Sequence, residues 1–323
     1  MGSTQIHDRL RARHVAALSA APLNCRYYYF GGVSGRRVRA QGRRELLALA
    51  GDRESSIRVV EWPDGSCAAA ALRFQPWDSE RLGVRTGRID FYVSDPMASQ
   101  LGDGLESLLD EVRSLARAMP LQLISLKLDV GLSSLARQLV THGFALMNCE
   151  HVLVHDGPEN GPAVVAPLGV EVRAIARTRM PALERLGGLF GDSRFHADPR
   201  IPAAAADGLW RRSIRDACEG FADEVFVAFH DGEPAGFVTC RDDQTTAETF
   251  GSSVRDFALV GVKRKCQGRG IGTWLMHHAS MASLRKTPRL QVTTQAHNHA
   301  AMRLYQRVGF KLAASRYNMH LWN

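Results

Sequence analysis

The sequence predicts an α/β protein whose mixed sheets are flanked by helices, and three observations lead to this fold class. An apolar run over residues 257–262 is followed by a glycine-rich turn and then by a helical apolar pattern. The first half of the chain alternates strand and helix patterns of its own. Residues 135–144 also resemble residues 301–310, and both stretches end in Gly-Phe. A chain of 323 residues with such a repeat is expected to form two related domains.

The expected elements of the first half follow from apolar spacing. Apolar points among arginines predict a helix over residues 4–21. The strands are expected at residues 57–62, 67–74, 88–93, 121–128 and 149–155, with a helix over residues 99–118.

The expected boundary between the domains is a Gly- and Pro-rich stretch, which indicates a linker over residues 156–168. The first domain would span residues 1–155 and the second 169–323. The second half should contain a strand at 169–174, helices near 180–190 and 203–219, and a hairpin at 224–229 and 235–241. Strands at 257–262, 290–295 and 316–322 complete it.

Composition excludes several classes of protein. Lys and Arg number 41 against 33 Asp and Glu, a net charge of +8, which suits a polyanionic ligand and equally well suits plain solubility. The arginines of residues 36–44 lack a nucleic-acid-binding motif, so we expect a solvated face and no nucleic-acid partner. No apolar run approaches the ~20 residues needed to cross a bilayer, so no membrane partner is expected.

The cysteines favour a reducing compartment. They are scattered singly, with neither the paired spacing of a zinc site nor a dense disulfide framework. Cys266 precedes the glycine-rich turn without an evident base partner, which favours a bystander thiol. A cytoplasmic location is therefore expected.

The glycine-rich turn carries the first chemical signal. It reads Gln267-Gly268-Arg269-Gly270-Ile271-Gly272 and opens a helix. A helix that begins on glycines offers unpaired backbone N–H groups and the positive end of its dipole to an anion, and phosphate is the natural guest. Glycines at such a corner can also serve the turn alone.

A second signal lies downstream, where Asn298, Ala301, Leu304 and Tyr305 recur at helical spacing before Gly309-Phe310. With these residues and with Gln267-x-x-Gly270-x-Gly272, the chain resembles the GNAT acyltransferase superfamily. The implied fold is a tandem of GNAT-like mixed sheets, in which a complete C-terminal domain follows a partial, catalytically silent copy. In the first copy Leu132 and Leu139 stand where the second has Asn298 and Tyr305, and we expect no comparable glycine loop there.

The resemblance implies an acetyl-CoA site and its residues. The strand before the glycine turn would bind pantetheine and polarise the thioester, the turn would hold the pyrophosphate, and Asn298 would bind the pantetheine arm. Tyr305 would be the general acid that protonates the departing thiolate; its alternative is a simple amphipathic-helix residue. The donor-binding residues so implied are Leu259, Val260, Val262, Gln267, Gly268, Arg269, Gly270, Ile271, Gly272, Thr273 and Asn298.

A finer resemblance, to the TDP-fucosamine acetyltransferase group, rests on the tandem layout and on two short motifs. These are Trp77-Asp78-Ser79 and the stretch Ser193-Arg194-Phe195 with Asp198-Pro199. It implies that the acceptor is an amino sugar linked to a dTDP carrier. The acceptor-binding candidates are Trp77, Asp78, Ser79, Arg194, Phe195 and Asp198, for which a helix-capping role is an equal alternative.

Several questions stay open at this level. The general base could be Glu248, His196 or His297. Adjacent histidines on a helix point to different faces, so His277-His278 and the pair around Asn298 do not indicate a metal site, and no metal is expected. The acceptor could instead be another small amine, such as an antibiotic, a polyamine or an amino acid. A CoA-binding regulatory protein with vestigial activity is the alternative from another class, and a homodimer is implied by the resemblance alone.

Overall fold

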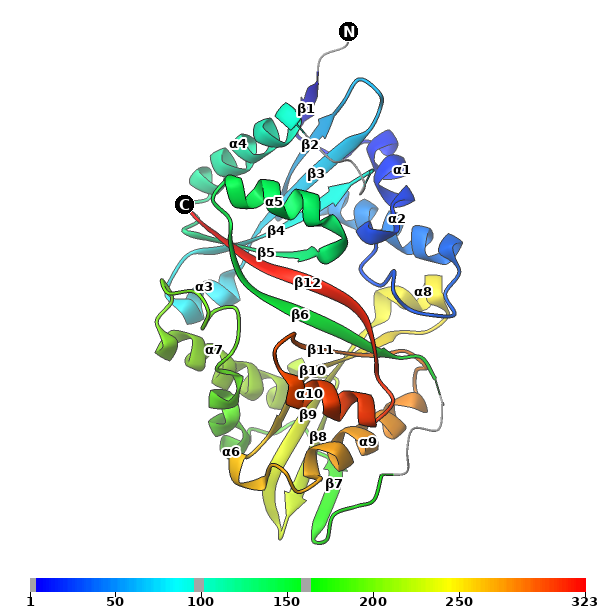
Figure 1. The fold of residues 1–323 in the computed structure, drawn as a ribbon, viewed down its shortest axis with the longest axis vertical. Helices are drawn as coiled ribbons and strands as arrows, with labels where there is room; N and C mark the ends of the chain where they lie inside the picture. Colours follow the sequence, from blue (N-terminus) through cyan, green and yellow to red (C-terminus); the bar gives the residue numbers. More distant parts are fainter. Residues whose placement is uncertain (1–3, 96–101, 158–163) are drawn as a thin grey trace. The chain divides into compact units, whose positions relative to one another are not determined.

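The protein is described by a computed structural model that covers residues 4–95, 102–157 and 164–323. It folds into two compact units (Figure 1). The first unit comprises residues 1–29, 33–149 and 315–323, and the second comprises residues 30–32 and 150–314. This division differs from the expected one at residues 155 and 169, because each unit takes its last strand from the other half of the sequence. Residues 158–163 of the expected linker lie outside the described residues.

The first unit is built on a mixed sheet with the strand order β1-β2-β3-β4-β5-β12. Strands β4 and β5 run parallel, and the other neighbours are antiparallel. The strands are β1 (Gln5–His7), β2 (Ser55–Glu61), β3 (Cys67–Phe74), β4 (Thr86–Val93), β5 (Leu123–Asp129) and β12 (Lys311–Trp322). The residues of β12 that pair with β5 are 316–322.

Helices cover both faces of this sheet, and β3 shows why. Successive side chains of a strand point to opposite faces, so Ala68, Ala70 and Leu72 join one core while Cys67 and Ala69 join the other. The first core also contains apolar residues of α4 and α5, and the second contains those of α1 and α2. The helices are α1 (Ala12–Ala20), α2 (Gly35–Gly51), α3 (Pro76–Leu82), α4 (Gly102–Ala118) and α5 (Ser133–Thr141).

The helix expected over residues 4–21 is wrong at its beginning. Gln5–His7 forms β1, which pairs with the edge of β2 through Gln5↔Glu61 and His7↔Val59. Only Ala12–Ala20 is helical. Apolar spacing along the chain could not reveal a pairing partner some fifty residues away, and that partner decides the conformation of these residues.

The second unit has a sheet with the order β6-β11-β10-β9-β8-β7. Strands β10 and β11 run parallel, and the other neighbours are antiparallel. The strands are β6 (Ala145–His155), β7 (Val170–Ala174), β8 (Glu224–His230), β9 (Glu233–Asp243), β10 (Val254–Val262) and β11 (Leu290–Gln295). The residues of β6 that pair with β11 are 150–155.

Two cores hold the helices of the second unit against its sheet. One contains apolar residues of α9 (Ile271–Leu284) and α10 (His299–Arg307). The other contains those of α6 (Pro181–Glu184), of the 3-10 turn η3 (Arg185–Phe190) and of α7 (Ala203–Asp216). The short α8 (Ala247–Phe250) precedes β10.

The expected fold class is confirmed, and the internal repeat is visible in the elements. Helices α5 and α10 are both nine residues long, and each lies between a strand that pairs in parallel and a long final strand. The expectation that the first copy lacks a comparable glycine loop stays a prediction, because residues 96–101 before α4 lie outside the described part. Its helix α4 opens on Gly102, which has φ 51°, and Gly104, at the same spacing as Gly270 and Gly272. Residues 99–101, where that helix was expected to begin, lie outside the described part.

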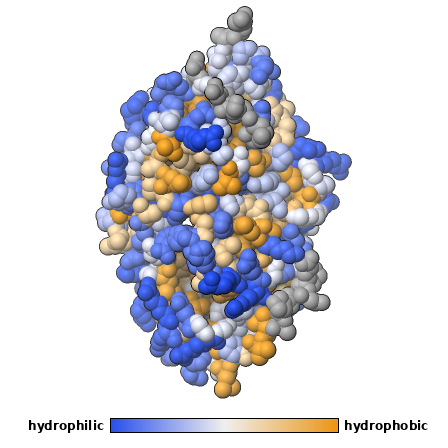
Figure 2. Space-filling view, viewed as in Figure 1, coloured by the Kyte–Doolittle hydropathy of each residue, from blue (hydrophilic) through white to orange (hydrophobic). Residues whose placement is uncertain are grey.

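The surface is mixed in character. Figure 2 shows one face on which hydrophobic residues lie among hydrophilic ones. Within the described ranges, none of the helices is both long enough and apolar enough to cross a membrane.

Candidate active site

A divergence of two parallel strands defines the candidate site of the second unit. The β10–β11 ladder ends at Phe257↔Val292, although β10 continues to Val262 and β11 to Gln295. On its other side β11 stays paired with β6 as far as Gln295↔Glu150. Beyond the last pair, the facing edges of β10 and β11 find no ladder partner among the residues described. A V-shaped opening with unpaired backbone groups results, and such groups can bind an extended ligand as a strand would.

The shape of β10 explains the divergence. Its register against β9 shifts between Phe257 and Leu259, which leaves Ala258 as an extra residue. A β-bulge of this kind bends the strand and increases its local twist. On the β9 side the strands remain close, because a side chain at Gly236 would come within 2.8 Å of the Gly261 carbonyl oxygen. The bend therefore turns β10 away from β11 and not from β9.

The glycine-rich turn lies directly after β10 and leads into α9. Gly268 and Gly270 have φ values of 74° and 78°, and Gly270 is the N-cap of the helix. A non-glycine residue adopts this left-handed conformation only at a cost. No acceptor within the described chain is found for the backbone N–H groups of Gly268, Arg269 and Gly270. Together with the first free N–H groups of the helix, they form an anion-binding end.

Positively charged side chains surround this turn and would also attract an anion. The side chains of Arg264, Lys265 and Arg269 are exposed, so cationic groups surround the free N–H groups. The Gln267 side chain does not point to a ligand, because its Nε2 donates to the Val262 carbonyl at 3.0 Å. Gln267 thus fastens the turn to the end of β10, and its predicted part in donor binding is indirect.

Helix α10 supplies the two polar residues predicted from the later motif. The Asn298 Oδ1 accepts a hydrogen bond from the Ala301 N–H at 3.1 Å and caps the helix. Only its Nδ2 remains available to a ligand. The α10 helix packs against α9, since a side chain at Gly272 would come within 2.8 Å of Leu304. The glycine of the motif is therefore also needed for helix packing.

Tyr305 is buried, with 5% of its surface exposed, and its ring packs against Phe310. Its hydroxyl has no hydrogen-bond partner within the part of the chain that is described. Burial raises the pKa of Tyr305, so the phenol stays protonated at neutral pH. A protonated hydroxyl without an internal partner is suited to donate to a ligand.

The acceptor-binding candidates of the first unit lie on or beside α3. Trp77 is 37% exposed, and the Arg81 guanidinium lies 5.3 Å from its ring centroid. The Ser79 hydroxyl donates to the Gln75 carbonyl and accepts from the Thr86 N–H. Ser79 is therefore engaged within its own turn, while Trp77 presents an aromatic face.

The candidates of the second unit lie in the loop before α7. Phe195 and Asp198 are each 2% exposed, and Asp198 accepts from the Arg200 N–H at 3.0 Å. The Arg194 guanidinium lies 4.2 Å from the Phe195 ring centroid. Of these three, only Arg194 retains partial exposure. The capping and packing alternative is thus favoured for Phe195 and Asp198.

The possible general bases differ in their surroundings. His196 has both ring nitrogens engaged, with Ser193 Oγ at 2.7 Å from Nδ1 and Asp207 Oδ1 at 3.2 Å from Nε2. With both ring nitrogens engaged, this imidazole orders its loop. Glu248 and His297 are both exposed. The paired histidines separate as expected: His277 stacks on Trp274, and His278 packs edge-on to Phe226.

Sequence reasoning missed an ionic clamp beside the loop that carries Arg194. The buried Glu184 carboxylate accepts hydrogen bonds from Arg179 Nε at 2.7 Å and from Arg215 Nη2 at 2.8 Å. These arginines lower the pKa of Glu184 to about 2. Arg179 and Arg215 lie 5 and 31 positions from Glu184 in the sequence, and no spacing rule predicts these contacts.

Comparison with known proteins agrees with this geometry. Residues 192–310 match the model of the acetyltransferase (GNAT) family. The chain is 30% identical over 136 residues to the spore coat polysaccharide biosynthesis protein SpsD of Bacillus subtilis. That match covers 41% of this chain and 44% of the relative, so the chain spans less than half the length of the curated protein.

Solved structures show the same fold over nearly the whole chain. A GCN5-related N-acetyltransferase from Sphaerobacter thermophilus matches with a TM-score of 0.63 at 17% identity, over 99% of this chain and 95% of the other. A glucosamine N-acetyltransferase region of a fungal β-N-acetylglucosaminidase matches with a TM-score of 0.62 at 17% identity, over 99% of this chain and 38% of the other. A tandem GNAT protein from the clavulanic acid biosynthesis pathway matches with a TM-score of 0.53 at 14% identity, over 99% of this chain and 98% of the other. The chain therefore has the tandem GNAT fold, and the part of its second half over residues 192–310 is similar to the acetyltransferase (GNAT) family.

Proposed function

We propose that the protein is an N-acetyltransferase that transfers the acetyl group of acetyl-CoA directly to the amine of an amino sugar carried on a nucleotide such as dTDP. The observation that carries this proposal is the opening between β10 and β11, which lies directly before a glycine turn with free N–H groups. The residues fit acetyl-CoA, because an extended amide-rich arm can pair with the open edge of β10 and a pyrophosphate can bind the cationic end of α9.

The chain's own groups supply the remaining chemistry. Backbone N–H groups on the open edge of β10 beyond Leu259 would polarise the thioester carbonyl and stabilise the oxyanion that forms when the amine attacks. The Leu259 N–H is not among them, because it donates to Thr239 Oγ1 at 3.0 Å. Tyr305 would donate its proton to the departing thiolate, and its buried, protonated hydroxyl suits that role. Asn298 Nδ2 would bind the donor's pantetheine arm.

Support for a sugar acceptor comes from relatives. One is named for polysaccharide biosynthesis and another for acetylation of glucosamine. In the second unit, Arg194 would bind a phosphate of a nucleotide-linked acceptor. Trp77 and Asp78 of the first unit stay predictions from the resemblance. The location proposed for the reaction is the cytoplasm, where acetyl-CoA is available, and the assembly proposed is a homodimer.

The test is release of free thiol from acetyl-CoA in the presence of dTDP-amino sugars, free amino sugars and simple amines, with product masses recorded. An acetyl mass gained by a dTDP-amino sugar would support the whole proposal. Turnover with simple amines alone would retain the chemistry and reject the acceptor. Tight CoA binding without turnover on any amine would favour a regulatory CoA-binding protein.

A further inference from the structure

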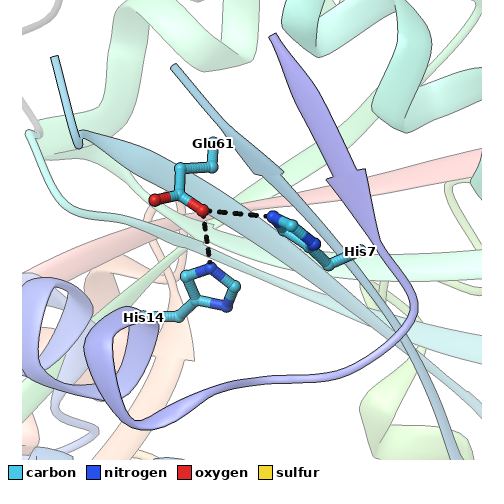
Figure 3. A group of neighbouring side chains, drawn as sticks. All are labelled: His7, His14 and Glu61. Atoms are coloured by element: carbon cyan, nitrogen blue, oxygen red, sulfur yellow. Dashed lines mark hydrogen bonds and ion pairs between the residues drawn. The ribbon is translucent and has the colours of Figure 1, made fainter. Parts of the chain in front are cut away.

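A cluster outside the candidate active site brings together two imidazoles and a carboxylate (Figure 3). His7 comes from β1, His14 from α1 and Glu61 from the end of β2. Both Nε2 atoms lie 3.1 Å from the same oxygen, Glu61 Oε2. The three ligand atoms all lie within 4.8 Å of one another.

The cluster is well enclosed. His7 is 8% exposed and His14 is 1% exposed, and the side chain of Glu61 is 19% exposed. Buried imidazole and carboxylate groups need partners that satisfy them. Since each of the three side chains belongs to a different element, a partner common to all three would fasten the N-terminal segment to the sheet.

Hydrogen bonds alone do not account for the crowding of nitrogen atoms around one oxygen of this cluster. Glu61 Oε2 lies near four nitrogen atoms: Nε2 of His7, Nε2 of His14, and Arg13 Nη2 at 2.7 Å and Nε at 3.1 Å. A carboxylate oxygen offers about two lone-pair sites. Even with the Arg13 Nε–H assigned to Oε1, three nitrogen atoms compete for the lone pairs of this oxygen, whereas imidazole lone pairs and the oxygen can converge on a cation.

We propose that His7, His14 and Glu61 bind a divalent transition-metal ion of the zinc class, with a structural role in the first unit. Two imidazoles and one carboxylate are ligands that zinc accepts, and a water molecule would complete four-coordination. Separations of 3.1 Å between ligand atoms are close to those around a metal with bonds of about 2.0–2.2 Å. Arg13 Nε, 3.0 Å from Oε1, would hold the other carboxylate oxygen and orient the ligand.

Metal binding would require His14 to give up one hydrogen bond. His14 Nδ1 faces the Arg11 backbone N–H at 3.2 Å. When His14 Nε2 binds a metal, Nδ1 carries the proton and gives up this contact. If the Arg11 bond prevails instead, Nε2 is the protonated nitrogen, and the cluster is a hydrogen-bonded network without metal.

The first experiment is equilibrium dialysis of the full chain against Zn²⁺, with bound metal measured per chain. We expect one tightly bound equivalent in the native sequence and its loss in His7→Gln and in His14→Gln. His277→Gln is the matched control, because it removes a partly exposed histidine from another site and should keep the equivalent. Absence of a stoichiometric equivalent, or its persistence in both variants of the cluster, would overturn the proposal.

A second measurement guards against loss of the fold in these variants. Co²⁺ bound to the native chain should give visible absorption bands of a four-coordinate nitrogen and oxygen site, and one equivalent of Zn²⁺ should abolish them. Zn²⁺ should also raise the melting temperature of the native chain and of His277→Gln. Spectra of fully hydrated Co²⁺, with an unchanged melting temperature, would identify a hydrogen-bonded network.

Discussion

The two units contain the same divergence of parallel strands, and within the described residues only the first fills it with its own chain. The β4–β5 ladder ends at Ile89↔Leu126, although β4 continues to Val93 and β5 to Asp129. Asn24 donates to the Val93 carbonyl and accepts from the Val93 N–H, and the Tyr28 hydroxyl donates to Asp129 at 2.7 Å. The segment from Asn24 to Tyr28 thus occupies the ends of both strands.

A GNAT fold can therefore keep its framework and lose its substrate opening. The first unit retains the glycine pair at the start of α4, yet the Asn24 side chain takes the Val93 backbone groups that a ligand would need. In the second unit the equivalent edge has no such partner in the described residues. We therefore propose that catalysis belongs to the second unit and that the first has a structural role.

The largest effect should come from Tyr305→Phe. Loss of a general acid is expected to lower kcat by about 10²–10⁴-fold, while the affinity for CoA stays near that of the native protein. The measurements are initial rates of thiol release and a CoA-binding titration. Tyr317→Phe, on β12 of the first unit, is the control and should leave both unchanged; an undiminished rate in Tyr305→Phe would reject the acid assigned here.

Asn24→Ala should lower the stability of the protein and leave its activity unchanged. Asn24 is 6% exposed and bonds Leu18 and Val93, so its removal leaves buried backbone groups unsatisfied. The expected loss is about 2–3 kcal/mol in the free energy of unfolding, measured by denaturant titration. The rate per folded molecule should stay the same, and CoA binding to a second site in this variant would show that the first unit is only blocked.

Alanine variants of Gly270 and Gly102 test whether the glycines at the starts of α9 and α4 have different roles. Gly270 and Gly102 both have positive φ, at 78° and 51°, so alanine at either position should cost about 1–2 kcal/mol in stability. Only Gly270→Ala should raise the KM for acetyl-CoA, by about tenfold, because a Cβ at this positive φ would turn the N–H groups of the proposed phosphate site away from their direction. Steady-state kinetics at several acetyl-CoA concentrations checks this. An equal rise in KM for Gly102→Ala would contradict the division of roles.

The smallest effect concerns the ionic clamp of the second unit. The pKa of Glu184 is lowered from 4.5 to about 2, so its stabilisation is fully present above pH 4.5 and is lost as the pH falls toward 2. Because Arg179 and Arg215 are partly exposed, Glu184→Gln should cost only about 1–2 kcal/mol at pH 7. Denaturant titrations at pH 7 and pH 3 should show the difference from the native protein shrinking in acid; a difference that grows in acid would contradict the clamp.

The sequence predicts the elements whose causes are local. β3 and β11 have the bounds expected from their apolar runs, and the turn at Gly268 and Gly270 leads into a helix as expected. The α2 helix was not anticipated, because its exposed arginines hide a narrow apolar stripe of Val38, Leu46 and Leu49.

Features that depend on distant partners could not be predicted. Asn24 acquires its role only through Val93, 69 residues away, and Glu61 meets His14 across 47 residues. The conformation of Gln5–His7 depends on the β2 edge in the same way. Single-sequence patterns report periodicity along the chain, and they contain no register between strands that lie far apart in it.

The exchange of final strands has a consequence for synthesis. The ladder of β5 is completed by residues 316–322, which are translated nearly two hundred residues after it. The first unit cannot close its sheet before these residues are made, which takes roughly 10–40 s at common elongation rates. During that interval β5 exposes an unpaired edge to chaperones and to neighbouring chains. Truncation at the linker would make this exposure permanent.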